Sequence, residues 1–473
     1  MPAIKQLFGH LRWYEASEYA LMMLMVVSVP IHWRLGVWCM ALLGINFIIK
    51  SIATRSLGNR SLSRPAIVCL CLMALYYLVY AVSISYSNNP AEGWSMIFIM
   101  LPLLIFPLIF LLSDMSYLTI THHKTLIYLL AATLTVRFIL LALRAAVLSP
   151  LSDLIGDTTH LLASSTLQSA SLLFGGTFLN QAIVGPISAI MKFVAELLEM
   201  TSIASFKHFT FDHLHHNYLA IYIITAIAFL YAELIRNWKH PRWRKMRWVI
   251  IADMALLTVS IIVSDSRSGL VVFAMLAAVC VAHLAVVRKQ WLTTGIIVGI
   301  LAALIGATYL ATPKSFKRII DTAQSLAKGE EGDVRQTLWS SSLEAMKGHL
   351  LVGYGCEGYW NALSDSYQSN ECDSGFKHNF NPHNQYLETA LATGVVGLAV
   401  ILAMILAPAA FALRHKPRNM HIVLFTVVYA GCMFFEASFG RQMGLLFICW
   451  WYGFLLLTPQ PSLKNAMTND IFL

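Results

Sequence analysis

Residues 65–86 read PAIVCLCLMALYYLVYAVSISY, an apolar run without a charged side chain. A helix of about 20 apolar residues crosses the ~30 Å hydrocarbon core of a bilayer. Similar blocks recur along the 473-residue chain, which is 58% hydrophobic and 12% charged with a mean hydropathy of +0.66. Soluble domains carry roughly 25% charged residues. The composition therefore excludes an ordinary soluble enzyme and predicts an all-α polytopic membrane protein.

The spacing of the apolar blocks predicts about twelve transmembrane helices. Their ranges are about 16–31, 33–50, 65–86, 94–113, 125–143, 217–235, 248–263, 269–287, 291–312, 384–408, 420–436 and 443–459. The chain is thereby divided into helices one to five (1–143), an interfacial segment (144–216), helices six to nine (217–312), a large polar loop (313–382), and the last helices with a tail (383–473).

The positive charges predict the orientation. If the N-terminus is cytoplasmic, the loops on its side hold 19 Lys and Arg, and the short loops opposite hold only Arg34, Arg267 and Arg441. Such an excess marks the cytoplasmic face. Both termini are therefore expected in the cytoplasm, with the large loop outside. The net charge of +9 comes from the short loops between the apolar blocks, so nucleic acid is not an expected partner. No removable signal peptide is expected at the N-terminus.

Two cysteines, Cys356 and Cys372, lie in the large loop, whereas the other six fall inside predicted spans. A pair in an oxidising compartment predicts a disulfide, although two free thiols remain the alternative.

Arginines at bilayer depth are costly and usually functional. Arg137 and Arg144 lie two turns apart on one face of the fifth span. They are candidates for an anionic headgroup, and the alternative is an arginine that snorkels beside a structural partner.

The joint Ser264-Asp265-Ser266-Arg267-Ser268-Gly269 connects spans seven and eight. Ser and Gly suffice to make the turn, so Arg267 is free for another role. A guanidinium is a rigid fork of donors suited to phosphate oxygens. Arg267 is thus a candidate for phosphate binding, with an interface anchor as the alternative.

The large loop contains two further candidates. Arg335 opens a helical stretch that ends in a GYG turn, and Asn381-Pro382-His383 leads directly into a span. Asn as N-cap and Pro at the first position place His383 in the first helical turn. The positive end of the helix dipole there favours a neutral imidazole that can accept a proton. A purely structural histidine is the alternative.

Two other clusters flank predicted spans. Asp212-His213-Leu214-His215-His216 could ligate a metal, but the adjoining Asn217 and Tyr218 fit an interfacial helix start, and no metal is expected. Glu436 and Arg441 cap the last outer turn, where they form either a salt bridge or a substrate contact.

Three sequence features follow one another in a fixed order. They are SDSR ending at Arg267, Arg335 before an apolar helix that ends in GYG, and PHNQYLETALATGVVGL around His383. Together with about twelve spans and the large loop, they resemble the O-antigen ligase and polymerase superfamily, most closely O-antigen ligase. The resemblance extends over about 210–450, and the first 200 residues match only in hydropathy. It implies a GT-C-like membrane glycosyltransferase of the bacterial inner membrane.

The resemblance also implies roles for individual residues. Arg267 and Arg335 match the two essential arginines that hold the donor diphosphate, and His383 matches the essential histidine of the loop. Asn217 falls in a segment where His216 replaces the usual proline, so it is a candidate without a catalytic role. The remaining site candidates are Ser266, Asn384, Tyr386 and Arg441.

The implied donor is a glycan on undecaprenyl diphosphate, and neither metal nor nucleotide is needed as a cofactor. The expected reaction is inverting transfer of a polysaccharide to lipid A–core at the periplasmic face, within membrane lipids. The same motifs also allow a polymerase of the lipid-linked glycan or a protein O-glycan transferase. A transporter of lipid-linked sugars would instead have charges and broken helices near the midplane and repeated halves.

Overall fold

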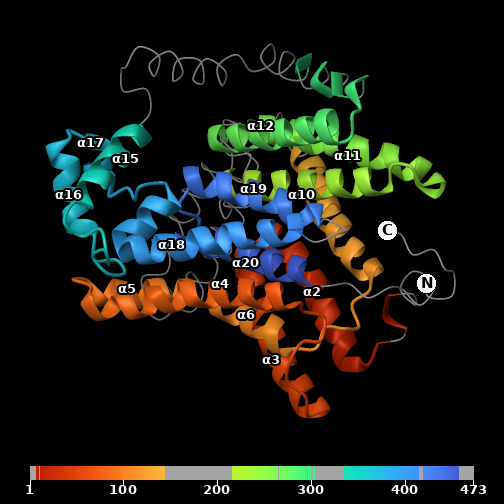
Figure 1. The fold of residues 1–473 in the computed structure, drawn as a ribbon, viewed down its shortest axis with the longest axis horizontal. Helices are drawn as coiled ribbons and strands as arrows, with labels where there is room; N and C mark the ends of the chain where they lie inside the picture. The colour runs from red at the N-terminus through yellow and green to blue at the C-terminus, as the bar shows by residue number, and fades with distance from the viewer. Residues whose placement is uncertain are drawn as a thin grey trace, which may run out of the picture.

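The computed structural model describes residues 7–9, 11–143, 216–264, 266–292, 334–414 and 419–457, together with parts of 294–303. These residues form helices, and no strand is present among them. Most of the helices run side by side, and α15, α16 and α17 gather at one end of the bundle, which we call the cap end (Figure 1).

The first part of the chain builds one side of the bundle. Its helices are α2 (Trp13–Ile31), α3 (Trp33–Thr54), α4 (Arg64–Ser83), η1 (Ile84–Tyr86), α5 (Pro90–Ile99), α6 (Pro102–Leu112) and an unlabelled helix, Ile120–Leu143. The predicted span at about 94–113 is thus two helices. The break falls just before Pro102, whose missing N–H and bulky ring interrupt a continuous helix.

The second part supplies the centre, the opposite side and the cap. Its helices are α10 (His216–Asn237), η4 (Pro241–Trp243), α11 (Arg244–Val263), α12 (Arg267–Ala282), η5 (His283–Val287), α15 (Val334–Ala345), α16 (Trp360–Ser369), α17 (Asp373–His378), α18 (Gln385–Arg414), α19 (Met420–Phe435), η6 (Ser438–Gly440) and α20 (Gln442–Leu456). α10 is buried almost throughout because it packs against α11, α12, α19 and α20.

Eight helical stretches of the described residues are long and apolar enough to cross a membrane. They are α3, α4 with η1, α5 with α6, Ile120–Leu143, α10, α11, α12 with η5, and α18. α19 and α20 are apolar but shorter, and α2 is not among the eight. A multi-pass membrane protein is therefore confirmed, and the part of it that the structure describes is all-helical. The predicted number of twelve spans is not confirmed, and the span at about 291–312 falls largely outside the described residues.

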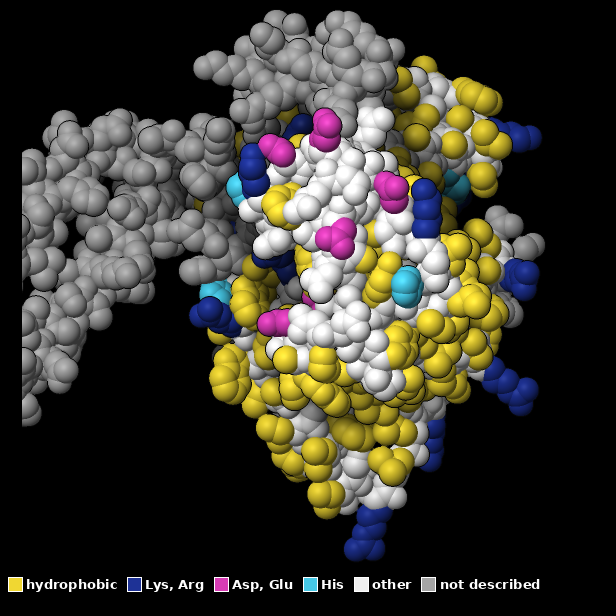
Figure 2. Space-filling view, turned by 90° about the vertical axis from the view of Figure 1, so that its left-hand side faces the viewer, with side chains coloured by type: hydrophobic (Ala, Val, Ile, Leu, Met, Phe, Trp, Pro, Cys, Tyr) yellow, Lys and Arg dark blue, Asp and Glu magenta, His cyan; other side chains and the backbone are white. Residues whose placement is uncertain are grey.

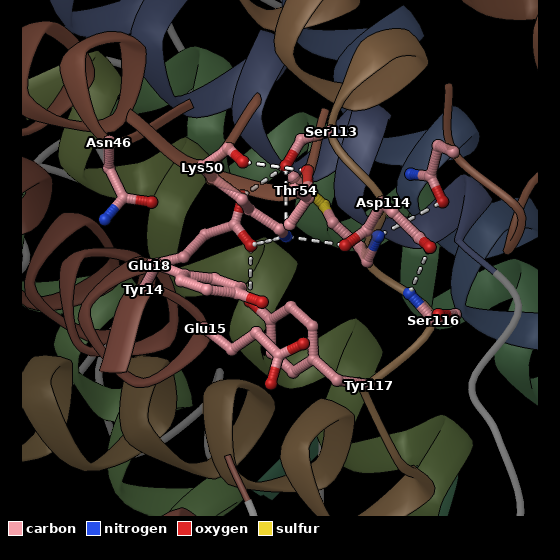
Figure 3. Close-up of polar contacts among 12 residues, drawn as sticks. Tyr14, Glu15, Glu18, Asn46, Lys50, Thr54, Ser113, Asp114, Ser116 and Tyr117 are labelled. Atoms are coloured by element: carbon pink, nitrogen blue, oxygen red, sulfur yellow. Dashed lines mark hydrogen bonds and ion pairs between the residues drawn. The ribbon is translucent and has the colours of Figure 1, made fainter. Parts of the chain in front are cut away.

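A buried ion pair joins three of the N-terminal helices (Figure 3). Lys50 of α3 donates to Glu18 Oε2 of α2 at 2.6 Å and to the carbonyl of Asp114 at 2.5 Å. Ser113, after α6, donates to Glu18 Oε1 at 2.6 Å, and Tyr117 donates to Oε2 at 2.9 Å. The side chains of Lys50 and Glu18 are only 5% and 1% exposed. Each charge is therefore neutralised and hydrogen-bonded, which buried charges require.

Replacing Lys50 with Met should be strongly destabilising, because the change leaves the Glu18 carboxylate buried without its cation. Removing one partner of a buried pair costs about 3–5 kcal/mol. We expect this loss in the unfolding free energy of the purified protein in mixed micelles. The double variant Glu18→Gln, Lys50→Met should recover most of it. A single variant as stable as the wild type would show that the pair does not hold these helices together.

Candidate functional site at the cap end

Asn217 is the centre of a polar network that connects three helix ends. It lies at the start of α10, is 7% exposed, and donates from Nδ2 to Glu436 Oε2 at 2.8 Å. Its Oδ1 accepts from Ser266 Oγ at 2.9 Å and from Ser268 Oγ at 3.1 Å. Because an amide can donate and accept at once, Asn217 fixes the start of α12 relative to the end of α19.

Glu436 extends this network to His383. Its backbone is extended at the C-cap of α19, and Oε1 lies 3.8 Å from His383 Nδ1. This distance is within the reach of an ion pair but too long for a hydrogen bond. Nδ1 is buried and makes no hydrogen bond to the described residues. The carboxylate can therefore stabilise a proton on the imidazole whenever the ring acquires one.

His383 precedes α18 instead of lying in its first turn. Asn384 is the residue that caps the helix, since its Oδ1 accepts from the backbone N–H of Tyr386 at 2.9 Å and of Leu387 at 3.1 Å. His383 has φ +47°, a left-handed conformation that cannot continue a helix. The predicted cap at Asn381 is therefore wrong by three residues. Asn381 instead accepts from the His383 backbone N–H at 3.1 Å and so fixes this turn.

α15 packs on the same turn and carries Arg335. Trp339 donates from Nε1 to the carbonyl of Pro382 at 3.0 Å, and its ring contacts Phe434 of α19 with centroids 5.0 Å apart. Arg335 is four residues before Trp339 and lies on the same face of α15. The helix face that carries Arg335 is thus packed against the residues that precede His383 and Glu436.

Arg267 and Arg441 lie at the starts of α12 and α20 and are exposed. Arg267 is the first residue of α12, directly after Ser266, which is fully buried and caps the helix through the N–H of Gly269 at 3.1 Å. Arg441 is the N-cap of α20. Neither guanidinium forms an ion pair with a described residue, and both are solvent-exposed. Two cations are therefore accessible beside the buried network.

Of the two arginines proposed for the fifth span, the structure describes Arg137. Arg137 is 6% exposed and donates to the carbonyl of Pro30 in the last turn of α2. Carbonyls in a last turn lack partners within their helix, so this contact gives Arg137 a structural role. The donor-binding role of Arg137 stays a prediction, and Arg144 lies outside the described residues.

Tyr386 and the two cysteines of the large loop have packing contacts of their own. Tyr386 donates its hydroxyl to the carbonyl of Ala430 at 2.9 Å, so it ties α18 to α19. Cys356 and Cys372 are both free thiols, and the predicted disulfide is absent. Cys356 is fully buried against Gly93 of α5, and this burial raises the pKa of its thiol, whereas Cys372 is the N-cap of α17. The two thiols therefore lie in separate packing environments of the cap end.

The pairing of Glu436 with His383 and Asn217 was not foreseen from the sequence. The available signal was an acidic residue at the end of an apolar block, but its partners lie 53 and 219 positions away (436 − 383 and 436 − 217).

Within the residues that the structure describes, no group of three or more His, Cys, Asp or Glu side chains has an arrangement suited to a metal. Most of the cluster at 212–216 lies outside them.

The fold and the network define a multi-pass membrane protein whose polar site, with its accessible cations, lies at one end of the bundle. The family model described as O-antigen ligase matches residues 252–402. This part of the chain is similar to the O-antigen ligase family, and it contains Arg267, Arg335 and His383. Asn217, Glu436 and Arg441 lie outside the matched region. No curated protein matches the chain.

Proposed function

We propose that the protein transfers a polysaccharide en bloc from undecaprenyl diphosphate to lipid A–core, with its cap end at the periplasmic face of the inner membrane. The family match supports a membrane glycosyltransferase of the O-antigen ligase type that uses lipid-linked glycans. The observation that carries the proposal is the network from His383 through Glu436 and Asn217 to Ser266, beside Arg267. It joins motifs that are distant in sequence into one site.

The donor is already activated, so the site has two tasks. It must stabilise the diphosphate as it leaves, and it must deprotonate the incoming hydroxyl. Arg267 is accessible and has no competing carboxylate among the described residues, so its guanidinium is free to bind phosphate oxygens bidentately. Arg335 would bind the same diphosphate from α15. Such fixed cations stabilise developing charge without moving during the reaction.

His383 would act as the general base through Nε2, because Nδ1 is the nitrogen that faces Glu436. When the imidazole takes the proton from the acceptor hydroxyl, the Glu436 carboxylate stabilises the resulting cation, as an aspartate does in a Ser-His-Asp triad. Attack by the hydroxyl forms the new glycosidic bond as the bond to the diphosphate oxygen breaks. A single displacement of this kind inverts the anomeric centre, and it requires no metal.

Replacing Glu436 with Gln should lower turnover by about 10- to 100-fold, because each 1.4 kcal/mol of lost stabilisation costs a factor of about ten. The amide retains the size of the side chain but cannot stabilise an imidazolium. Asp365→Asn is the matched control, since Asp365 is exposed on α16 in the cap. Initial rates of glycan transfer in vesicles measure the effect. A Glu436→Gln rate equal to that of the control would exclude Glu436 as the partner of His383.

The proposal is tested by reconstituting the protein with an undecaprenyl-diphosphate glycan, with and without purified lipid A–core, and by resolving both lipids on gels. Lipid A–core that carries the glycan is the expected product. A ladder of longer glycans on the undecaprenyl carrier, formed without lipid A–core, would instead identify a polymerase and overturn the acceptor assignment.

A further inference from the structure

Three consecutive apolar side chains protrude from the polar segment between α15 and α16. Leu350, Leu351 and Val352 are 63%, 73% and 53% exposed. Soluble surfaces rarely present such a run unless it has a function. We call these three residues the tip.

The backbone of the tip is held in a break of α18. At Gly394 the helix has φ 63° and ψ −156°, and a Cβ there would lie 2.4 Å from the Leu351 carbonyl carbon. Val395 N donates to Leu350 O at 2.8 Å, and Tyr86 donates its hydroxyl to Val352 O at 2.7 Å. The carbonyls of residues 391 and 392 accept from the N–H groups of residues 354 and 355, both at 2.9 Å. These contacts fix the backbone and leave the tip side chains free.

The position of the break places the tip at the edge of the hydrocarbon. Residues 395–414 of α18 measure about 30 Å at 1.5 Å per residue, which equals the ~30 Å thickness of the hydrocarbon core. The preceding turns carry Gln385, Glu388 and Thr389, which are buried polar residues at the cap end. Gly394 therefore lies where the membrane-spanning part of α18 begins.

The surroundings of the tip are those of a membrane boundary. Tyr86 and Trp94, at the cap ends of α4 and α5, are 43% and 56% exposed, and Val395 and Val396 of α18 are about as exposed. Tyr and Trp gather at the headgroup level of membranes. Seen from the cap end, acidic side chains are spread over the cap, and hydrophobic side chains gather around its lower margin (Figure 2).

We propose that Leu350, Leu351 and Val352 insert into the acyl chains of the membrane leaflet at the cap end and anchor the cap there. The tip is continuous with the lipid-facing residues of α5 and α18, so bilayer lipid is the partner that its position favours. α15 ends at Ala345, shortly before the tip. The anchor therefore holds the helix that carries Arg335 at a fixed height above the membrane. The inference rests on packing and exposure alone and does not depend on the proposed reaction.

The test uses the full chain in vesicles of phosphatidylethanolamine and phosphatidylglycerol that contain no glycolipid. A nitroxide is attached to the cysteine of a Leu351→Cys variant. The variant also carries Cys71→Ser, because Cys71 is an exposed native thiol that would react with the label. Spectra of the Cys71→Ser protein without the new cysteine are subtracted. Collision rates with oxygen, which concentrates in hydrocarbon, are compared with those of a water-soluble nickel chelate. Leu78→Cys on the exposed face of α4 is the lipid reference, and Ser369→Cys on α16 is the water reference.

The label at 351 should resemble that at 78, with oxygen collisions dominating, and a label at Val352→Cys should repeat the result. Nickel accessibility at both 351 and 352 equal to that at 369 would overturn the proposal. Protection from nickel that develops only after an undecaprenyl-diphosphate glycan is added would also overturn it, because the tip would then bind the substrate chain instead of bilayer lipid.

Discussion

The His383→Ala variant should lose glycan transfer almost completely. A positioned general base contributes about 10²–10⁴-fold to a reaction rate, and alanine provides no group that can accept the proton. The substitution should leave the fold intact, because the His383 side chain is 31% exposed and its Nδ1 has no hydrogen bond to a described residue. Initial transfer rates in vesicles, normalised to the amount of folded protein, measure the loss.

The control for His383 comes from the neighbouring turn. His378→Ala removes an exposed imidazole at the end of α17, and its transfer rate should equal that of the wild type. Donor lipid should accumulate in cells that carry His383→Ala and not in cells that carry His378→Ala. If His383→Ala retained a rate within a factor of a few of the wild type, the general base would have to be another group.

Replacing Arg267 with Lys should reduce transfer by about 10²–10³-fold, the usual effect of removing one fixed donor from a site of developing negative charge. Lysine keeps the charge but cannot form the two parallel hydrogen bonds of a guanidinium with phosphate oxygens. Arg267 is exposed and forms no ion pair with a described residue, so the substitution breaks no ion pair within the described part of the chain. Transfer rates measured over a range of donor concentrations report the effect.

A matched variant separates the two interpretations of Arg267. Arg34→Lys changes an exposed arginine in the first turn of α3, far from the network in sequence, and it should leave transfer unchanged. If Arg267 were only an anchor at the membrane interface, both lysine variants would be nearly as active as the wild type. Near-normal turnover of Arg267→Lys would thus contradict its assignment to the diphosphate.

The sequence predicts the helical membrane architecture because long apolar blocks have few alternatives in a bilayer. It does not predict where helices break. Gly394 is one of many glycines in apolar blocks, and its left-handed conformation depends on the backbone at residues 350–355, which lies some forty positions earlier. The sequence does contain a signal for the helix break before Pro102, since proline interrupts helices.

The candidate site was predicted residue by residue but without its internal contacts. Both Asn381 and Asn384 are suitable N-caps by residue type, and only the left-handed backbone of His383 selects Asn384. The link from Ser266 through Asn217 and Glu436 to His383 joins four helix ends that are distant in sequence. Spacing along the chain contains no information about such contacts. For the same reason, Cys356 and Cys372 were expected to pair although they pack separately.

The most direct test of the proposed chemistry is the release of undecaprenyl diphosphate in vesicles that contain the protein, donor and lipid A–core, in the presence of EDTA. We expect one undecaprenyl diphosphate for each glycan transferred, undiminished by EDTA and absent for His383→Ala. Transfer that stops when EDTA is added, or that proceeds normally with His383→Ala, would contradict it.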